Sequence, residues 1–177
     1  MDIVDLRYPI GRFQKETDIS ESRRNELIEG ISVLPTDLRL AVAEMSPEQL
    51  DTPYRSGGWT VRQVVHHLAD SHMNAFIRYR LALTEHEPTV KPYDEKLWAE
   101  LPDSRSAPVE LSLKLLECLH SRWTLMLRAL PEEEFSKTFK HPALGLLTLD
   151  VQLSLYHWHG KHHLSQITAL QTRMQWK

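Results

Sequence analysis

Residues 148–174, TLDVQLSLYHWHGKHHLSQITALQTRM, have the apolar spacing of one long amphipathic helix. Thr148 can cap the start of this helix, and Asp150 in its first turn suits the positive end of the helix dipole. At roughly 100° per residue, one set of side chains falls within roughly 40° of a single line. This inward set comprises Gln152, Tyr156, His159, His163, Ile167, Leu170 and Met174. The opposite, solvent-facing side carries Ser154, Lys161, Ser165 and Thr172.

Two earlier segments also have helical spacing of apolar residues. The first runs from Ser20 to Met45 and contains Pro35, which should kink the helix because proline lacks a backbone N–H. The second follows a glycine-rich turn, and Thr60 and Gln63 form a capping box at its start. We expect this second helix to run from Val61 to about Leu83, because a proline-rich segment follows.

A third helix is predicted from Val109 to Leu130, where a proline again ends the pattern. The connections on either side of it are long: residues 85–108, with one short helix at DEKLWAEL, and residues 132–147. Strand signals are weak throughout the chain. The sequence therefore predicts an all-α protein, a four-helix bundle forming a single domain over residues 1–177, with long connections between helices 2 and 3 and between helices 3 and 4.

Composition excludes several classes of protein. The formal net charge is -3, with no basic excess of the kind that nucleic-acid binding requires. No segment approaches the roughly 18 uninterrupted apolar residues that a membrane-spanning helix needs. The N-terminal segment lacks the features of a secretory signal, and the single Cys118 excludes an internal disulfide. We expect a cytoplasmic protein that binds neither nucleic acid nor membrane, in which Cys118 is an incidental thiol.

Seven of the ten histidines lie in two short segments, HHLADSH at 66–72 and HWHGKHH at 157–163. His159 and His163 are one helical turn apart on the inward face, with Cβ atoms about 5 to 6 Å apart, so both imidazoles can reach one ion. The alternative is a pair of core histidines satisfied by hydrogen bonds. Burying two imidazoles without partners is costly, and one metal ion would satisfy both of them. This cost makes a metal site more plausible for a pair of inward histidines than for a single one, and both interpretations stay open.

The second helix carries a polar stripe beside its broad apolar sector. The stripe consists of Gln63, His67, Ser71, Asn74 and Arg78. It can be read as a solvated face, or as the polar surroundings of a metal site in a bundle cleft. Spacing alone does not choose among the three histidines of this helix.

The chain resembles the DinB-like metal-binding four-helix bundles, and closely their YfiT-like branch of metal-dependent hydrolases. The resemblance runs almost end to end. It is carried by LRYPIGRF (6–13), LDTPYRSGGWTVRQVVHHLADSHMN (50–74), KPYDEKLW (91–98) and WHGKHHLSQI (158–167). The second of these blocks is the most specific.

The resemblance implies three metal ligands. A histidine before a leucine on the second helix and an H-x-x-x-H pair on the last helix correspond here to His67, His159 and His163. The helical projection selects His159 and His163 independently, whereas His67 rests on the resemblance. This chain departs from the family pattern at Ser165, where the motif has glycine.

The resemblance also implies one divalent metal per chain, most simply Zn²⁺ with Ni²⁺ as the alternative. It further implies a homodimer, which the wide apolar sector of the second helix also favours.

Three neutral histidines leave one coordination position open, as in catalytic zinc sites. Water in that position would be activated as hydroxide, which favours a metal-dependent hydrolase acting on a small molecule. A low-molecular-weight thiol would be deprotonated there, and some relatives transfer thiols such as bacillithiol, so a thiol S-transferase is the alternative. A non-catalytic metal-binding protein is a third reading. Asp70, one turn from His67, is a candidate for orienting an imidazole or accepting a proton.

Overall fold

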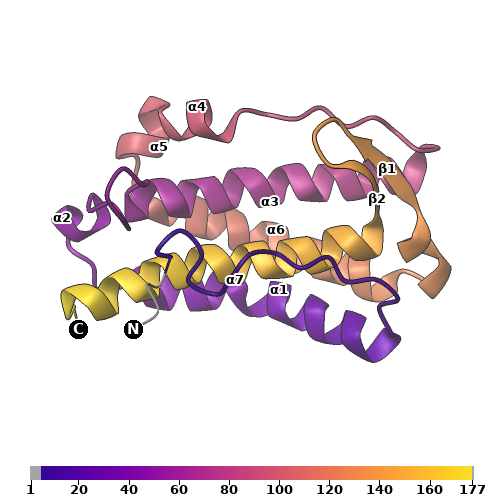
Figure 1. Cartoon of the computed structure of the whole chain (residues 1–177), viewed down its shortest axis with the longest axis horizontal. Coiled ribbons are helices and arrows are strands. Elements are labelled where there is room, and N and C mark those ends of the chain that lie inside the picture. Colours follow the sequence, from indigo (N-terminus) through magenta and orange to yellow (C-terminus); the bar gives the residue numbers. More distant parts are fainter. Residues whose placement is uncertain (1–4, 177) are drawn as a thin grey trace.

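Four long helices dominate the computed structural model, which describes residues 5–176 (Figure 1). They are α1 (Glu21–Val42), α3 (Val61–Thr84), α6 (Val109–Ala129) and α7 (Leu149–Met174). The connections contain α2 (Pro47–Leu50), α4 (Glu95–Ala99), α5 (Pro102–Ser106), the 3₁₀ helix η1 (Glu132–Ser136), and strands β1 (Thr138–His141) and β2 (Gly145–Thr148). Within residues 5–176, no helix combines the length and apolar character needed to cross a membrane.

The predicted helix starts are confirmed by their caps. The side chain of Thr60 accepts from the N–H of Gln63, and Gln63 returns a hydrogen bond to the Thr60 N–H, which completes the capping box of α3. Thr148 accepts from the N–H of Val151 at the start of α7. Ser20 caps α1, although α1 ends at Val42 and not at Met45. Local hydrogen bonding therefore sets where three of the four long helices begin.

The four-helix bundle is confirmed, with consecutive helices in an uncommon arrangement. α1 and α3 each pack mainly against α6 and α7, so α1 lies diagonally across from α3, and α6 from α7. The chain between α3 and α6 returns along α3, on which α4 and α5 pack. α3 and α6 consequently run in the same direction (Figure 1).

The core has two apolar halves separated by a polar layer. One half surrounds the fully buried Tyr79 and Trp123, and the other surrounds Leu68 and Leu116. Between these halves, along α3 and α6, lie the buried His72 and His120. Burial of imidazoles at the centre of a bundle requires hydrogen-bonding partners.

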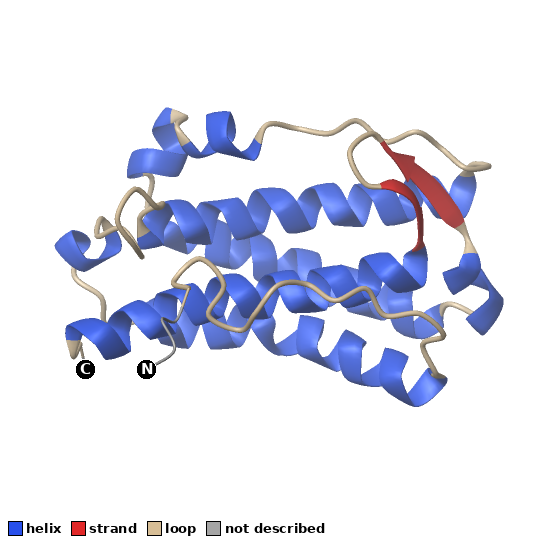
Figure 2. Ribbon diagram, viewed as in Figure 1, coloured by secondary structure: helices blue, strands red, loops and turns tan. Residues whose placement is uncertain are grey.

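The connection between α6 and α7 contains a β-hairpin that the weak strand signals did not predict (Figure 2). β1 and β2 are antiparallel, with Phe139 opposite Leu147 and His141 opposite Gly145. Gly145 has a φ of +75°, which glycine adopts at little cost. A parallel bridge joins Thr89 to Lys140, so the two long connections contact each other. This contact holds the strands, which propensity alone does not predict.

Two positions on α7 differ from the helical projection. Ser154 was expected to face solvent, but it is 1% exposed and its hydroxyl donates to the carbonyl of Val151. A short side chain that satisfies itself on its own helix can be buried cheaply. Met174 was expected on the inward line but is 48% exposed, because it lies in the last turn of the helix.

Gly160→Ala should destabilise the protein. A Cβ at position 160 would lie 2.4 Å from Cδ2 of Leu34, which is buried in α1 and has little room to move. Helix propensity favours alanine by about 1 kcal/mol, but overpacking of this depth costs about 1–3 kcal/mol. We expect a net loss of about 1 kcal/mol in the free energy of unfolding by urea denaturation, with the exposed Thr168→Ala as control. A rise in stability would mean that α1 and α7 are not in close contact here.

Candidate metal centre

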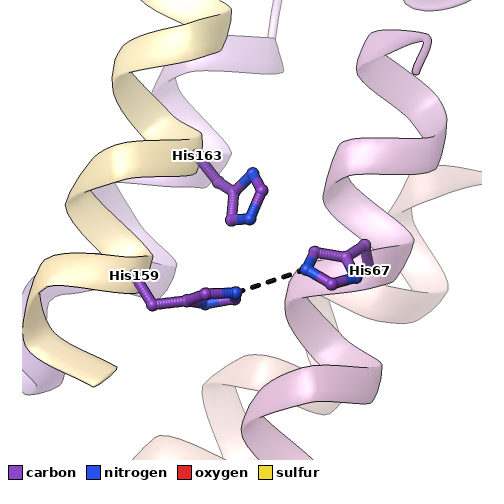
Figure 3. Close-up of side chains that lie close together, drawn as sticks. All are labelled: His67, His159 and His163. Carbon is purple, nitrogen blue, oxygen red and sulfur yellow. Dashed lines mark hydrogen bonds between the residues drawn. The ribbon is translucent and has the colours of Figure 1, made fainter. Parts of the chain in front are cut away.

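His67, His159 and His163 come together between α3 and α7 (Figure 3). One ring nitrogen from each lies within 4.8 Å of the others. Nε2 of His67 is 3.3 Å from Nε2 of His159, and the ring centroids of His159 and His163 are 4.5 Å apart. The structure thus brings together the three histidines that the sequence singled out. Their role as metal ligands stays a prediction.

The chemistry of these three groups fits a divalent ion. Burial lowers the pKa of His67 to about 4, and burial also lowers the pKa of His159 and of His163 well below the usual range. All three are therefore neutral at pH 7, with lone pairs available for coordination. Two ring nitrogens that face each other at 3.3 Å, beside a third imidazole, form a donor set suited to zinc.

Gln166 orients His163. The Nδ1–H of His163 donates to Oε1 of Gln166 at 2.9 Å, which leaves the lone pair of His163 on Nε2. The amide nitrogen of Gln166 donates to the carbonyl of Arg7 and to Nε2 of His162, each at 3.0 Å. Because both ends of the amide are engaged, its orientation is determined, and so is that of the imidazole.

His159 is oriented by a chain of two further histidines. Its Nδ1 lies 3.3 Å from Nε2 of His72, and Nδ1 of His72 lies 3.0 Å from Nε2 of His120. Nδ1 of His120 lies 2.7 Å from the carbonyl oxygen of Ile31. The chain passes from α7 through α3 and α6 to α1, so it contacts all four long helices.

The carbonyl at the end of this chain sets every tautomer in it. A carbonyl oxygen only accepts hydrogen bonds, so His120 carries its proton on Nδ1. Burial keeps His120, His72 and His159 neutral by lowering the pKa of each, to about 4 in the case of His120. Nε2 of His120 therefore accepts from His72, and Nε2 of His72 accepts from His159. The lone pair of His159 is left on Nε2, the nitrogen that faces His67.

Pro35 explains why the Ile31 carbonyl is available. In an α-helix, the carbonyl of residue 31 normally accepts from the N–H of residue 35. Pro35 lies inside α1 and has no N–H, so this acceptor is left without its helical partner. His120 supplies the missing donor from α6.

Sequence reasoning missed His72, His120 and Gln166. The sequence does indicate that His120 is buried, because it lies at helical spacing between the apolar residues Leu116 and Trp123 of α6. Its partner could not be identified, because helical periodicity gives the buried face of a helix but not the residue opposite.

Asp70 makes no hydrogen bond to the histidine cluster within residues 5–176, and its role as a proton acceptor stays a prediction. Burial raises the pKa of its carboxyl group to about 6. His66 is also separate from the cluster, since its ring nitrogens contact the hydroxyl of Ser112 and the carbonyl of Ala107. Cys118 is exposed and is not among the residues of this cluster.

Two cavities reach the histidine cluster. The first has a volume of about 630 Å³ and includes Trp59 and His163 in its lining. The second, of about 450 Å³, is lined by all three histidines and also by Trp59. The Trp59 ring lies 4.6 Å from the ring of His67, between centroids. Both volumes are in the range of small-molecule sites.

Comparisons with known proteins identify the family of this chain. A sequence profile of the DinB superfamily matches residues 31–167, more than half of the chain. This chain belongs to the DinB superfamily. A Bacillus cereus relative named "Putative metal-dependent hydrolase" is 54% identical over 97% of this chain and 99% of its own length. A similarly named protein from Bacillus thuringiensis subsp. konkukian is 53% identical over the same shares.

Two solved four-helix bundle structures are similar to this one as well. YfiT from Bacillus subtilis, described as a probable metal-dependent hydrolase with an unusual four-helix bundle topology, has a TM-score of 0.96 and 50% identity, covering 98% of this chain and 100% of YfiT. The four-helix bundle protein TT2238 has a TM-score of 0.58 at 21% identity, covering 82% of this chain and 98% of TT2238. The second likeness supports the fold alone.

His120→Leu should disturb the tautomer of His159 in this DinB-superfamily bundle. Leucine removes the acceptor for His72, so the proton of His72 can move from Nδ1 to Nε2. Nε2 of His72 then no longer has to accept from His159, and the proton of His159 is no longer confined to its Nδ1. We expect long-range ¹H–¹⁵N NMR of the metal-free protein to show both tautomers at His159, and zinc affinity in a competition titration to fall about tenfold or more.

His120→Asn is the matched control, because its amide can still donate to the Ile31 carbonyl and accept from His72. It should retain one tautomer at His159 and most of the zinc affinity. A single Nδ1-protonated form of His159 in the leucine variant would show that the chain does not set the tautomer.

Proposed function

We propose that this protein is a metal-dependent hydrolase in which His67, His159 and His163 hold one divalent ion. The observation that carries the proposal is the convergence of three neutral imidazoles from two packed helices on one point. Imidazole ligands suit zinc and nickel alike, and zinc is the ion proposed. The names of the close relatives support the same activity.

When bound, such an ion supplies Lewis-acid activation of water and of a substrate carbonyl at its open coordination position. The chain's own residues prepare the site. Gln166 and His72 hold two of the imidazoles with their Nε2 lone pairs facing inward, so little reorganisation accompanies binding. Trp59 packs on His67 and limits access of bulk water from that side.

His141 is a hydrogen-bond donor in the cavity of about 450 Å³. The backbone N–H of Ala143 donates to Nδ1 of His141 at 3.2 Å, so the proton of the neutral ring lies on Nε2. Burial, together with the nearby charge of Arg78, lowers the pKa of His141 and keeps the ring neutral. In the proposed function, Nε2–H of His141 is a donor available to a substrate oxygen in this cavity.

A thiol S-transferase is the second candidate. It is supported by the two cavities, of about 630 and 450 Å³, which both include Trp59 and His163 in their linings. Hydrolysis needs room for one organic substrate and water, whereas transfer of a low-molecular-weight thiol needs room for two organic molecules.

Purified protein should contain about one zinc ion per chain, and His163→Ala should lose it. His162→Ala is the matched control, because His162 is a neighbouring imidazole that contacts Gln166 and lies outside the cluster of three. It should keep most of the metal. Elemental analysis and a zinc competition titration measure both. Equal losses from the two variants would contradict the assignment of ligands.

Turnover should depend on the metal while the fold does not. Metal removal should abolish activity and leave the helical circular dichroism signal, because a core of this size does not need one ion to form. The reaction is followed by mass spectrometry with activated esters and amides in ¹⁸O-labelled water, then with an electrophile and a small thiol. Products containing ¹⁸O support the hydrolase and thiol adducts support the transferase. Neither product, in a protein with tightly bound metal, would contradict both enzyme proposals.

A further inference from the structure

The polar stripe of α3 is not a solvated face. Four of its five members, Gln63, His67, Ser71 and Arg78, are 9% exposed or less, and the fifth, Asn74, is half-buried. The amide of Gln63 donates to the carbonyl of Ala99 in α4, and His67 belongs to the histidine cluster. Ser71 and Arg78 are the buried members for which the proposed metal site provides no role.

Arg78 differs from the other buried arginines among residues 5–176. Arg24 pairs with Asp150 at 2.9 Å, and Arg62 pairs with Asp51 at 2.7 Å. Arg78 is 9% exposed and makes no ion pair with a carboxylate in the described part of the chain. A buried cation without a counter-ion is costly, so an arginine in this state is typical of a site that receives an anion.

The hydrogen bonds of Arg78 leave most of its donors available. Its Nη1 donates to the hydroxyl of Tyr156 at 3.3 Å, and the hydroxyl of Ser71 donates to the same oxygen at 3.4 Å. Both distances exceed the usual range of about 2.7–3.2 Å, and a guanidinium has five N–H donors. The Tyr156 oxygen accepts in both contacts, so its own O–H is not used by either and can donate to a ligand.

Arg78 lines the same cavity of about 450 Å³ as the three histidines. It lies eleven residues after His67, which is about three helical turns and about 16 Å along α3, on nearly the same face. The other charged residue in the lining is Glu95, which is exposed. The guanidinium nevertheless contacts the same Tyr156 oxygen as Ser71, which lies one turn after His67. The Tyr156 ring packs on that of His159, with centroids 5.5 Å apart, so the cavity holds the buried cation beside the histidine cluster.

We propose that Arg78, with the hydroxyls of Ser71 and Tyr156, binds a carboxylate group of the substrate. This proposal rests on the proposed function, because it places the scissile group of the same substrate at His67, His159 and His163. A planar carboxylate matches the guanidinium in charge and can accept two parallel hydrogen bonds from it. Phosphate shares this chemistry but is dianionic, and Arg78 is the single cationic side chain of the lining. The substrate class is thus a small molecule that carries a carboxylate besides the group that is cleaved.

The test is calorimetric titration of the zinc-loaded full-length protein with three probes of one shape: benzoate, neutral benzamide and phenyl phosphate. Arg78→Gln keeps a donor for Tyr156 but removes the charge. Arg80→Gln is the matched control, since Arg80 is exposed on the same helix and contacts the ring of Phe76. Circular dichroism and zinc content are measured on every sample.

We expect wild type to bind benzoate at least about tenfold more tightly than benzamide and more tightly than phenyl phosphate. Arg78→Gln should lose at least about tenfold in benzoate affinity, and Arg80→Gln should match wild type. Equal benzoate affinity in the Arg78→Gln and wild-type proteins would overturn the proposal, as would no binding of benzoate at all. Tighter binding of phenyl phosphate would overturn the choice of a carboxylate.

Arg78→Lys decides the matter if Arg78→Gln does not fold. Lysine keeps the charge but lacks the planar pair of donors, so benzoate affinity should fall by at least about threefold. Unchanged affinity in Arg78→Lys would overturn the contact with the guanidinium. Zinc content separates this proposal from the metal site: benzoate binding that depends on Arg78 in a protein without zinc would contradict the metal centre and support the carboxylate subsite.

Discussion

The hydrogen-bonded chain from His159 through His72 and His120 to the carbonyl of Ile31 is the interaction on which the site depends. Each of the four long helices contributes one member, so the chain forms only when all four are packed in register. Its direction follows from one carbonyl that can only accept a hydrogen bond. Because Pro35 has no N–H, that carbonyl is left without its helical partner, so a proline in the interior of α1 provides the acceptor on which the chain ends.

This chain also explains how polar groups can occupy the centre of the bundle. Apolar side chains fill the core on both sides, around Trp123 in one half and Leu116 in the other. Between them, a buried imidazole with one partner missing would destabilise the fold, whereas a fully satisfied series of imidazoles does not. Removal of one member therefore affects the tautomers and the packing together, which couples stability to the geometry of the candidate metal site.

In the proposed function, α3 links the candidate metal site to substrate recognition. The same face of this helix carries His67, Ser71 and Arg78, all buried, and α7 faces it with Tyr156 and His159. The cavity between them has an arginine without an acidic partner and a cluster of neutral imidazoles. In the proposed function, one helix face thus positions a metal ligand and the cation that binds the substrate carboxylate.

The sequence by itself determined the four helices, two of the site residues and the family. The 3.6-residue period places His159 and His163 on the buried face of α7, and local capping at Thr60 and Thr148 sets the helix starts, because these features depend on neighbours within one helix. Helical spacing did not choose which histidine of α3 joins the cluster, and His67 was expected from the family resemblance alone. The tertiary structure supplies the physical reason: His66 contacts groups of α6 and of the segment before it, His72 contacts His120 in the core, and His67 faces α7. Tertiary contacts likewise formed the β-hairpin, buried Ser154 and enclosed Arg78. Periodicity tells which side of a helix is buried, but the partner opposite is chosen by how the helices pack, and the chemistry of this site depends on those partners.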